Sequence, residues 1–402
     1  MIRNVSLTCA ASKASAREEA IARSLEDCLR IREPERCGPT RPDCIETAAR
    51  QVSDVLFASR KTRIGCSPTE EQRHQMSERV ARWIEVGAPI QVSTLWSATK
   101  GYGQVPDRVV ADVADLLGLR RFEELHQRVT GIYAPGISIG VIREDITERI
   151  LAGKIANLGM LTELYSRSLD GICDALGISG HISFIDESRI LGRRGVTAAA
   201  FIERAAENAG LIFDYWIASS RAPNSSKWHT LQEYKRLQEA GWTGTMPQAM
   251  RDHYIDRVST EHPDATTEEK IGFVCKYLGT ALARYQFKLF GGSTMDLSGN
   301  VIAPIKTGFV PYPPGTDPSL GMCRVEYRLK DGKSSNNYIP PWVGFGFLSP
   351  LENGGYDTKV IGLNAFRSIP REAIEPFSVR IGCGESGKEQ KIEADILSTA
   401  LR

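Results

Sequence analysis

Three consecutive stretches of sequence decide the fold: 87-GAPIQVSTLWSATKGYG-103, 105-VPDRVVADVADLLGLRRFEELHQRV-129 and 131-GIYAPGISIGVIREDI-146. The apolar run at Ile90–Trp96 predicts a buried strand. Apolar residues recur at helical spacing over Asp107–Val129, and Ile137–Ile142 alternates branched with small residues as a second strand does. Polar residues follow both predicted strands. Because ligands of open α/β sheets bind at the carboxyl ends of the strands, this unit indicates where a functional site would lie.

The same alternation continues on both sides of this unit. A helix is predicted over Ser67–Glu85, where a Ser-Pro-Thr-Glu sequence gives an N-terminal capping pattern. A second helix is predicted over Lys154–Leu176, and a third short strand over His181–Ile185. Strands separated by long helices predict an α/β fold with a largely parallel sheet flanked by helices.

Composition divides the chain into four parts. We expect an N-terminal helical segment over 1–66, an α/β core over 67–195, an added helical region over 196–292, and a β-rich part over 293–402 that completes the fold. Gly and Pro become more frequent in the last part, as in chains with many turns. The strands predicted there, at least partly antiparallel, are Val301–Ile305, Met322–Leu329, Val343–Leu348 and Lys359–Leu363.

Charge and hydropathy exclude several classes of protein. Among 402 residues, charged side chains make up 25% and nearly balance, with a formal net charge of +1. This balance argues against a nucleic-acid partner held by a broad positive field. No stretch approaches the ~20 apolar residues of a membrane span, so no membrane partner is expected. The N-terminus lacks a secretory apolar region and the nine cysteines are scattered, which favours a cytoplasmic protein with reduced thiols.

Several familiar motifs are missing from the sequence. There is no GxxxxGK[ST] phosphate loop, no HExxH, no GxSxG and no GxGxxG at a strand-to-helix junction. The six histidines are dispersed, and the cysteines near the N-terminus lack paired CxxC spacing. We therefore expect no metal and no bound cofactor.

Lys100 is the first candidate functional residue. It follows the predicted strand that ends at Trp96, and Ser97, Thr99 and nearby glycines would permit close approach of an anion. Its ammonium could hold a phosphate, hold a carboxylate, or form an imine with a ketone. A solvated loop lysine is the alternative.

Charged residues also follow the second and third predicted strands. Arg143, Glu144 and Asp145 come after one strand, and Asp186 and Glu187 after the next. A carboxylate beside a cation would suit proton abstraction. The alternative is that these acids begin helices, where the helix dipole favours negative charge.

Arg284 and Lys288 are spaced four residues apart in a predicted helix. They would share one helix face and could clamp a phosphate together. A solvated basic face is the alternative.

The order of these motifs resembles the isonitrile synthase family of the pyoverdine and dityrosine biosynthesis group. The matching residues are Gly87, Pro89, Ile90, Lys100, Pro106, Asp107, Tyr133, Pro135, Gly136 and Asp145. Later in the chain Pro341 and Trp342 match a family Pro-Trp pair. Lys306 and Val343 stand where the family has histidines, so this chain resembles a distant member.

The resemblance implies a Rossmann-like core and condensation of an amino acid α-amine with ribulose 5-phosphate, in secondary metabolism and without a metal or redox cofactor. The implied catalytic residues are Lys100, Asp145, Asp186 and Glu187. The implied substrate-binding residues are Trp96, Ser97, Thr99, Arg143, Arg284, Lys288, Lys306 and Trp342. A homodimer is one option for the oligomeric state. The alternatives are another amine-modifying transferase or lyase, acting on a free or carrier-bound amino acid, and a non-catalytic binder of a phosphorylated metabolite.

Overall fold

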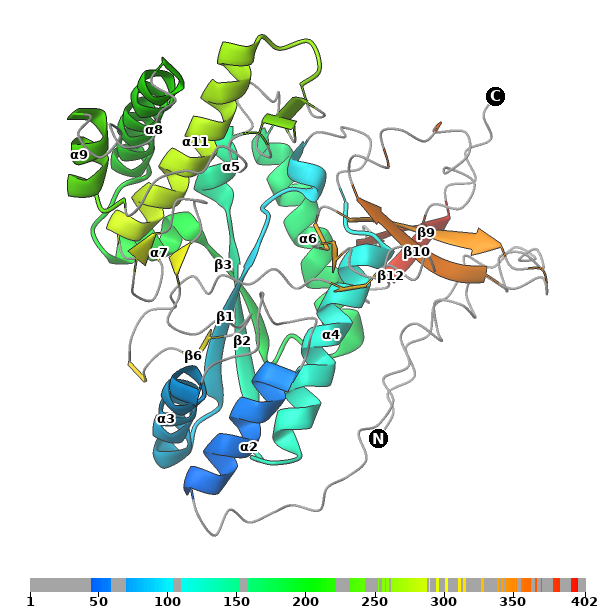
Figure 1. Cartoon of the computed structure of the whole chain (residues 1–402). Helices are drawn as coiled ribbons and strands as arrows, with labels where there is room; N and C mark the ends of the chain where they lie inside the picture. Colours follow the sequence, from blue (N-terminus) through cyan, green and yellow to red (C-terminus); the bar gives the residue numbers. More distant parts are fainter. Residues whose placement is uncertain are drawn as a thin grey trace.

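The computed structural model describes residues 45–58, 70–103, 110–151, 158–221, 232–242 and 262–287, with isolated residues between 252 and 259 and short segments between 289 and 396. The protein is a mixed structure of helices around a small sheet (Figure 1). Its central sheet has the strand order β3-β2-β1-β6.

Three parallel strands form the middle of this sheet, as the sequence predicts. They are β1 (Ile90–Trp96), β2 (Ile137–Arg143) and β3 (Ile182–Asp186). A fourth strand, β6 (Val310–Pro311), pairs antiparallel with β1. The sheet is therefore only partly parallel, and the Rossmann-like assignment remains a prediction.

Helices bury the apolar strands in a continuous core. Those packed in this core are α2 (Ile45–Ala58), α3 (Glu70–Val86), α4 (Val113–Thr130) and α6 (Leu158–Leu176). One predicted helix start needs correction, and a second is not tested by the described chain. The helix expected from Asp107 begins at Val113, after the cap residue Asp112, and residues 104–109 lie outside the described chain. The helix expected from Lys154 is described from Leu158, because residues 152–157 also lie outside it.

A helical part follows the sheet, as predicted. It contains α8 (Ala198–Arg221), α9 (Gln232–Glu239) and α11 (Thr267–Gln286), which share a core of their own. Helices α8 and α11 lie side by side (Figure 1). A Cβ atom on Gly279 would lie 2.6 Å from the Ala205 carbonyl oxygen, so the glycine allows this close approach.

The C-terminal part forms antiparallel pairs, which confirms the predicted antiparallel pairing there. The longer pairs are β9 (Gly344–Pro350) with β10 (Tyr356–Gly362), and β11 (Val379–Cys383) with β12 (Ile392–Ile396). The short ones are β4 (Thr294–Met295) with β5 (Val301–Ile302), and β7 (Tyr327–Arg328) with β8 (Tyr338–Ile339). The sequence did not predict β11 and β12. The four domain boundaries stay predictions.

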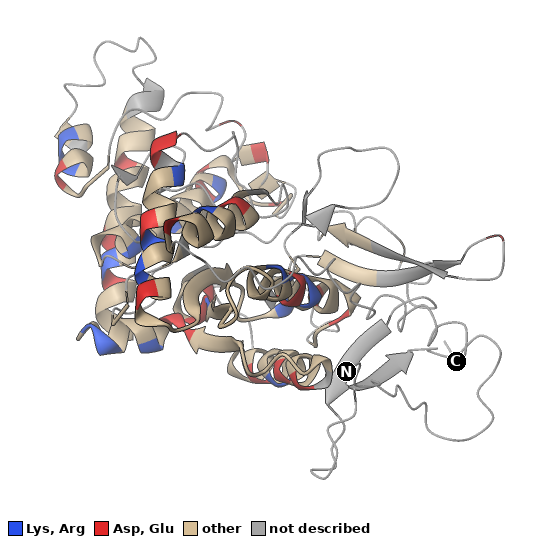
Figure 2. Cartoon of the chain, turned by 90° about the horizontal axis from the view of Figure 1, so that it is seen from below, with Lys and Arg blue, Asp and Glu red and all other residues tan. Residues whose placement is uncertain are grey.

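Residues of both charge signs are interspersed along the described helices (Figure 2). No helix in the described part of the chain is long and apolar enough to cross a bilayer.

Candidate functional site

The carboxyl ends of the three parallel strands lie in one row. The register places Trp96 opposite Arg143, and Arg143 opposite Asp186. Each strand leads into a short helical element: η1 (Lys100–Gly103), α5 (Asp145–Leu151) and α7 (Glu187–Arg193). The predicted charged residues are therefore brought to one edge of the sheet, and they fall into separate clusters there.

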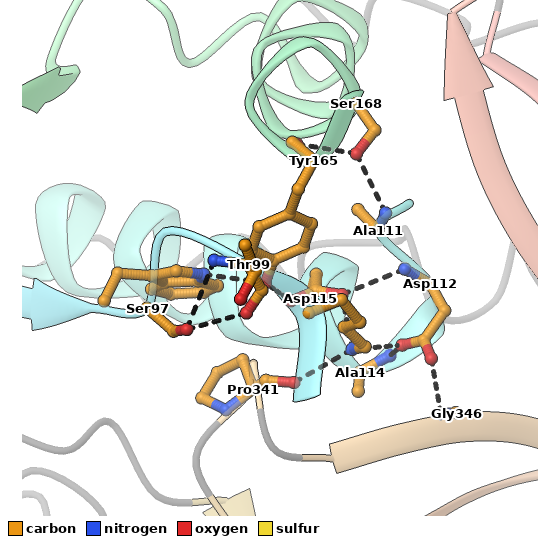
Figure 3. Close-up of polar contacts among 12 residues, drawn as sticks. Ser97, Thr99, Ala111, Asp112, Ala114, Asp115, Tyr165, Ser168, Pro341 and Gly346 are labelled. Atoms are coloured by element: carbon orange, nitrogen blue, oxygen red, sulfur yellow. Dashed lines mark hydrogen bonds and ion pairs between the residues drawn. The ribbon is translucent and has the colours of Figure 1, made fainter. Parts of the chain in front are cut away.

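Lys100 lies in a buried group that we name the Lys100 cluster, together with Asp112, Asp115 and Tyr165. Its Nζ donates to Asp112 Oδ1 at 3.0 Å, to Asp115 Oδ2 at 2.6 Å and to the Pro341 carbonyl at 3.0 Å (Figure 3). The lysine side chain has 0% exposed area. An ammonium carries three N–H donors, so all of them are used inside the protein.

The two aspartates of this cluster are also fully engaged. Asp112 caps helix α4: its Oδ1 accepts from Ala114 N at 2.7 Å and its Oδ2 from Gly346 N at 3.0 Å. Asp115 accepts from the backbone N–H of Asp112 at 2.9 Å and from the Tyr165 hydroxyl at 2.6 Å. Burial raises the pKa of Asp115 to about 6, against the lowering effect of the Lys100 ammonium.

The Lys100 cluster joins the sheet edge to the C-terminal part. Gly101 N donates to the Trp342 carbonyl at 2.7 Å, and the Trp342 ring packs on Trp96 with centroids 5.3 Å apart. The indole N–H of Trp96 donates to Tyr165 at 2.9 Å. A Cβ atom on Gly118 would lie 2.5 Å from Pro341 Cγ, so this contact requires glycine. Trp96 and Trp342 are thus core residues around the cluster.

This geometry changes the expectation for Lys100. A saturated, unexposed ammonium offers no donor to a phosphate or carboxylate, and imine formation would break three hydrogen bonds. Lys100 is therefore neither the solvated loop lysine nor the open anion site that the sequence allowed. We expect Lys100 to position the loop after β1 and the Pro341–Trp342 segment.

Glu148, on α5, holds the loop between β1 and Lys100. Its Oε1 accepts from Ala98 N at 2.6 Å and Thr99 N at 3.0 Å, and its Oε2 from Thr99 Oγ1 at 2.5 Å. The Ser97 hydroxyl also contacts Oε1. Burial raises the pKa of Glu148 to about 7, although the hydrogen bonds from Ser97 and Thr99 lower it. Ser97 and Thr99 therefore bind this carboxyl group, and their predicted contact with a substrate stays a prediction.

Arg284 lies in a second buried group, which we name the Arg284 cluster, together with Glu144, Glu187 and Thr147. Its Nε donates to Glu187 Oε1 at 2.6 Å and its Nη1 pairs with Glu144 Oε1 at 2.8 Å. Glu187 Oε2 accepts from the Thr147 hydroxyl at 2.9 Å. The third nitrogen of the guanidinium, Nη2, is buried and has no hydrogen-bond partner.

The electrostatics of the Arg284 cluster keep the arginine charged. Burial alone would lower the pKa of Arg284, but the carboxylates of Glu187 and Glu144 raise it overall. The predicted shared face with Lys288 needs correction, because α11 ends at Gln286 and Lys288 follows it outside the described residues. Arg284 is also not part of a solvated basic face, since its side chain is only 8% exposed.

Arg143 and Asp186 form a third, more open pair. Arg143 Nε donates to Asp186 Oδ1 at 2.8 Å, and Arg143 also contacts the Ser166 hydroxyl. The Asp186 side chain is 38% exposed. Asp145 accepts from Ser188 N at 3.0 Å. Burial raises the pKa of its carboxyl, and the nearby charges of Asp186 and Glu187 add to this shift.

The sequence interpretation missed Asp112, Asp115, Tyr165 and Glu148. The first two had a signal, because Asp-x-x-Asp at a helix start is typical of a capping box. Glu148 follows Glu144 by one helical turn, and the backbone N–H of Glu144 donates to the Trp96 carbonyl at the end of β1, so this spacing gave a signal for Glu148. Lys306, another predicted binding residue, lies outside the described residues. No group of three or more His, Cys, Asp or Glu within the described ranges is arranged to hold a metal ion.

Comparisons with known proteins give similarity at the level of structure. No family model matches the chain, and no curated protein matches it. Among solved structures, the chain is similar to the PvcA protein from Pseudomonas aeruginosa, with 14% sequence identity and a TM-score of 0.46. The similarity covers 80% of this chain and 94% of that one.

Proposed function

We propose that this protein is an isonitrile-synthase-like enzyme that condenses an amino acid α-amine with a pentulose phosphate such as ribulose 5-phosphate. One observation carries the proposal. The loop lysine and the Pro-Trp pair of the resemblance are separated by 241 residues, yet Lys100 Nζ donates to the Pro341 carbonyl. The motif elements therefore meet at the carboxyl end of β1, where an open α/β sheet binds its ligands.

The proposed reaction needs a group that moves protons. The amine adds to the C2 ketone of the sugar and loses water to give an imine, and a base then removes a carbon-bound proton. Of the three acids predicted as bases, Glu187 is held by Arg284 and Thr147, and Asp145 accepts a hydrogen bond from Ser188 N in the first turn of α7. Asp186 keeps an exposed carboxylate, so we assign the base role to Asp186.

The remaining residues have supporting roles in this proposal. Lys100 positions the loop after β1, and Arg143 orients the Asp186 carboxylate through its 2.8 Å hydrogen bond. Lys288 stays a proposed phosphate-binding residue, and Lys306 stays a proposed substrate-binding residue. The reaction as proposed uses no metal and no redox cofactor.

Turnover tests the proposal directly. The full chain is incubated with ribulose 5-phosphate labelled with ¹³C at C2 and with each of the twenty amino acids, and released phosphate and new masses are measured. We expect one amino acid to give a product that retains the labelled carbon, and Asp186→Asn to abolish it.

Three outcomes count against the proposal. Phosphate release without carbon transfer indicates a different lyase. Reaction only with an amino acid attached to a carrier protein, without the sugar, indicates another amine-modifying transferase. Binding of the sugar phosphate without any turnover indicates a non-catalytic binder.

A further inference from the structure

Arg284 Nη2 is the polar atom of the sheet edge that most needs an explanation. The residue is 6% exposed, and two of its three nitrogens already contact carboxylates. The third has no partner although it is buried. A buried unpaired donor is destabilising, most of all on a charged group, so such atoms mark sites of trapped water or ligand.

The charge around this nitrogen indicates which ligand fits. Two guanidinium groups and five carboxyl groups lie at the ends of β2 and β3 and on the first turns after them, and Arg284 of α11 adds a third guanidinium beside them. The residues at the strand ends and first turns are Arg143, Arg189, Glu144, Asp145, Glu148, Asp186 and Glu187. Within the Arg284 cluster itself, one cation meets two anions. A phosphate dianion would add negative charge to an already acidic site, where repulsion in a buried environment is strong.

Donor and acceptor lie next to each other in this cluster. Glu144 Oε1 is 2.8 Å from Arg284 Nη1, so its carboxylate is adjacent to the unpartnered Nη2. The Glu144 side chain is 13% exposed, while Glu187 is fully buried. A ligand that pairs with both Arg284 Nη2 and the Glu144 carboxylate must carry an anionic acceptor and a cationic donor a short distance apart.

We propose that the Arg284 cluster binds the zwitterion of a free α-amino acid, with its carboxylate on Arg284 Nη2 and its ammonium on Glu144. The two charged groups of an α-amino acid sit on one carbon, which matches adjacent donor and acceptor. The zwitterion is neutral overall, so the acidic surroundings do not repel it. This inference rests on the proposed function and names the place of the amino substrate, with the sugar phosphate bound elsewhere.

Binding measurements on the full chain test this inference. Each of the twenty amino acids, ribulose 5-phosphate and inorganic phosphate is titrated by calorimetry, with the amino acids measured both without and with ribulose 5-phosphate present. For the tightest amino acid, the N-acetyl derivative and the decarboxylated amine are titrated as well. We expect both truncated compounds to bind at least about tenfold more weakly, because each loses one charge-assisted contact.

A variant separates the amino acid from the phosphate. Glu144→Gln keeps an oxygen acceptor for Nη1 and removes the charge, whereas replacing Arg284 would leave Glu187 buried and unpaired. Glu144→Gln should raise the amino acid Kd about tenfold or more and leave the ribulose 5-phosphate Kd within about twofold. Glu71→Gln, on α3 and far along the chain from the cluster, serves as a charge-matched control with unchanged affinities.

The outcomes distinguish this inference from the proposed function. If Glu144→Gln weakens phosphate binding and spares the amino acid, or leaves every affinity unchanged, the inference is wrong and Nη2 holds phosphate or trapped water. Failure of every amino acid to bind under both conditions also overturns it. Turnover with an unchanged amino acid KM in Glu144→Gln keeps the proposed function and rejects the inference. Amino acid binding that depends on Glu144, without turnover, supports the inference and rejects the proposed function.

Discussion

The Lys100 cluster and the Arg284 cluster have the same formal composition: one cation and two carboxylates at the same edge of the sheet. In the first, all three N–H groups of the cation are paired, and one pairing reaches the C-terminal part. In the second, two nitrogens are paired and the third has no partner. A cation whose N–H groups are all paired stabilises the fold. A buried N–H group without a partner is suited to binding a ligand. The two clusters have the same charges and lie at the same edge of the sheet. They differ in whether every nitrogen of the cation has a hydrogen-bond partner.

Removing the cation of the closed cluster should have the largest effect on stability. Lys100→Met leaves Asp112 and Asp115 buried without their ammonium, and the free energy of unfolding should fall by about 3–5 kcal/mol. Urea unfolding measures the loss. Lys276→Met, an exposed lysine on α11, should change stability by less than about 0.5 kcal/mol. A fully stable Lys100→Met protein would mean that Lys100 faces a ligand after all.

The loop that carries Lys100 should respond to pH through Glu148. Its pKa is raised from 4.5 to about 7, so between these values the folded protein keeps a proton that the unfolded chain has lost. The free energy of unfolding should therefore fall as pH rises through this window, by roughly 3 kcal/mol from this group. Glu148→Gln mimics the protonated carboxyl and should reduce the change of the free energy of unfolding with pH.

In Glu148→Gln the free energy of unfolding should still depend on pH, because the pKa of Asp115 is also raised, to about 6. Denaturation at a series of pH values measures both contributions. Glu163→Gln, which changes an exposed acid on α6, should keep the wild-type slope. An equal slope in wild type and Glu148→Gln would show that Glu148 is ionised throughout.

The contact between α4 and the C-terminal part can be tested with two helical glycines. A Cβ at Gly118 would meet Pro341 at 2.5 Å, whereas Gly272 on α11 has nothing within 4 Å. Gly118→Ala should destabilise by about 1–3 kcal/mol through overpacking, and Gly272→Ala should stabilise by up to about 1 kcal/mol through helix propensity. Thermal unfolding of both variants measures the difference. Equal stabilisation of both would indicate that Pro341 does not pack there.

Neutralising one acid in each cluster gives the smallest effects and the most direct contrast in stability. Asp112→Asn must place its amide group against either Lys100 or the N–H of Gly346, so we expect a loss of about 1–3 kcal/mol. Glu144→Gln leaves Arg284 paired with Glu187 and keeps an oxygen acceptor for Nη1, so the loss should be smaller than that of Asp112→Asn. Chemical denaturation of the two variants compares them, and a larger loss for Glu144→Gln would reverse the interpretation of the two clusters.

The sequence predicted the strands well and the clusters poorly, for physical reasons. The bounds of β1 agree with the apolar run Ile90–Trp96, because burial of a strand leaves a local pattern. The Lys100 cluster depends on Pro341, which no local pattern connects to Lys100. Arg284 was predicted to clamp a phosphate, with a solvated face as the alternative. Helical spacing alone does not show that it meets Glu144, just before α5, and Glu187 of α7.

A structure of the protein with its tightest-binding amino acid is the most direct test of the difference between the two clusters. We expect the ligand carboxylate within hydrogen-bond distance of Arg284 Nη2 and its ammonium beside Glu144, with the three hydrogen bonds of Lys100 unchanged. A ligand bound to Lys100 Nζ, with the Pro341 carbonyl displaced, would show that the Lys100 cluster is the binding site instead.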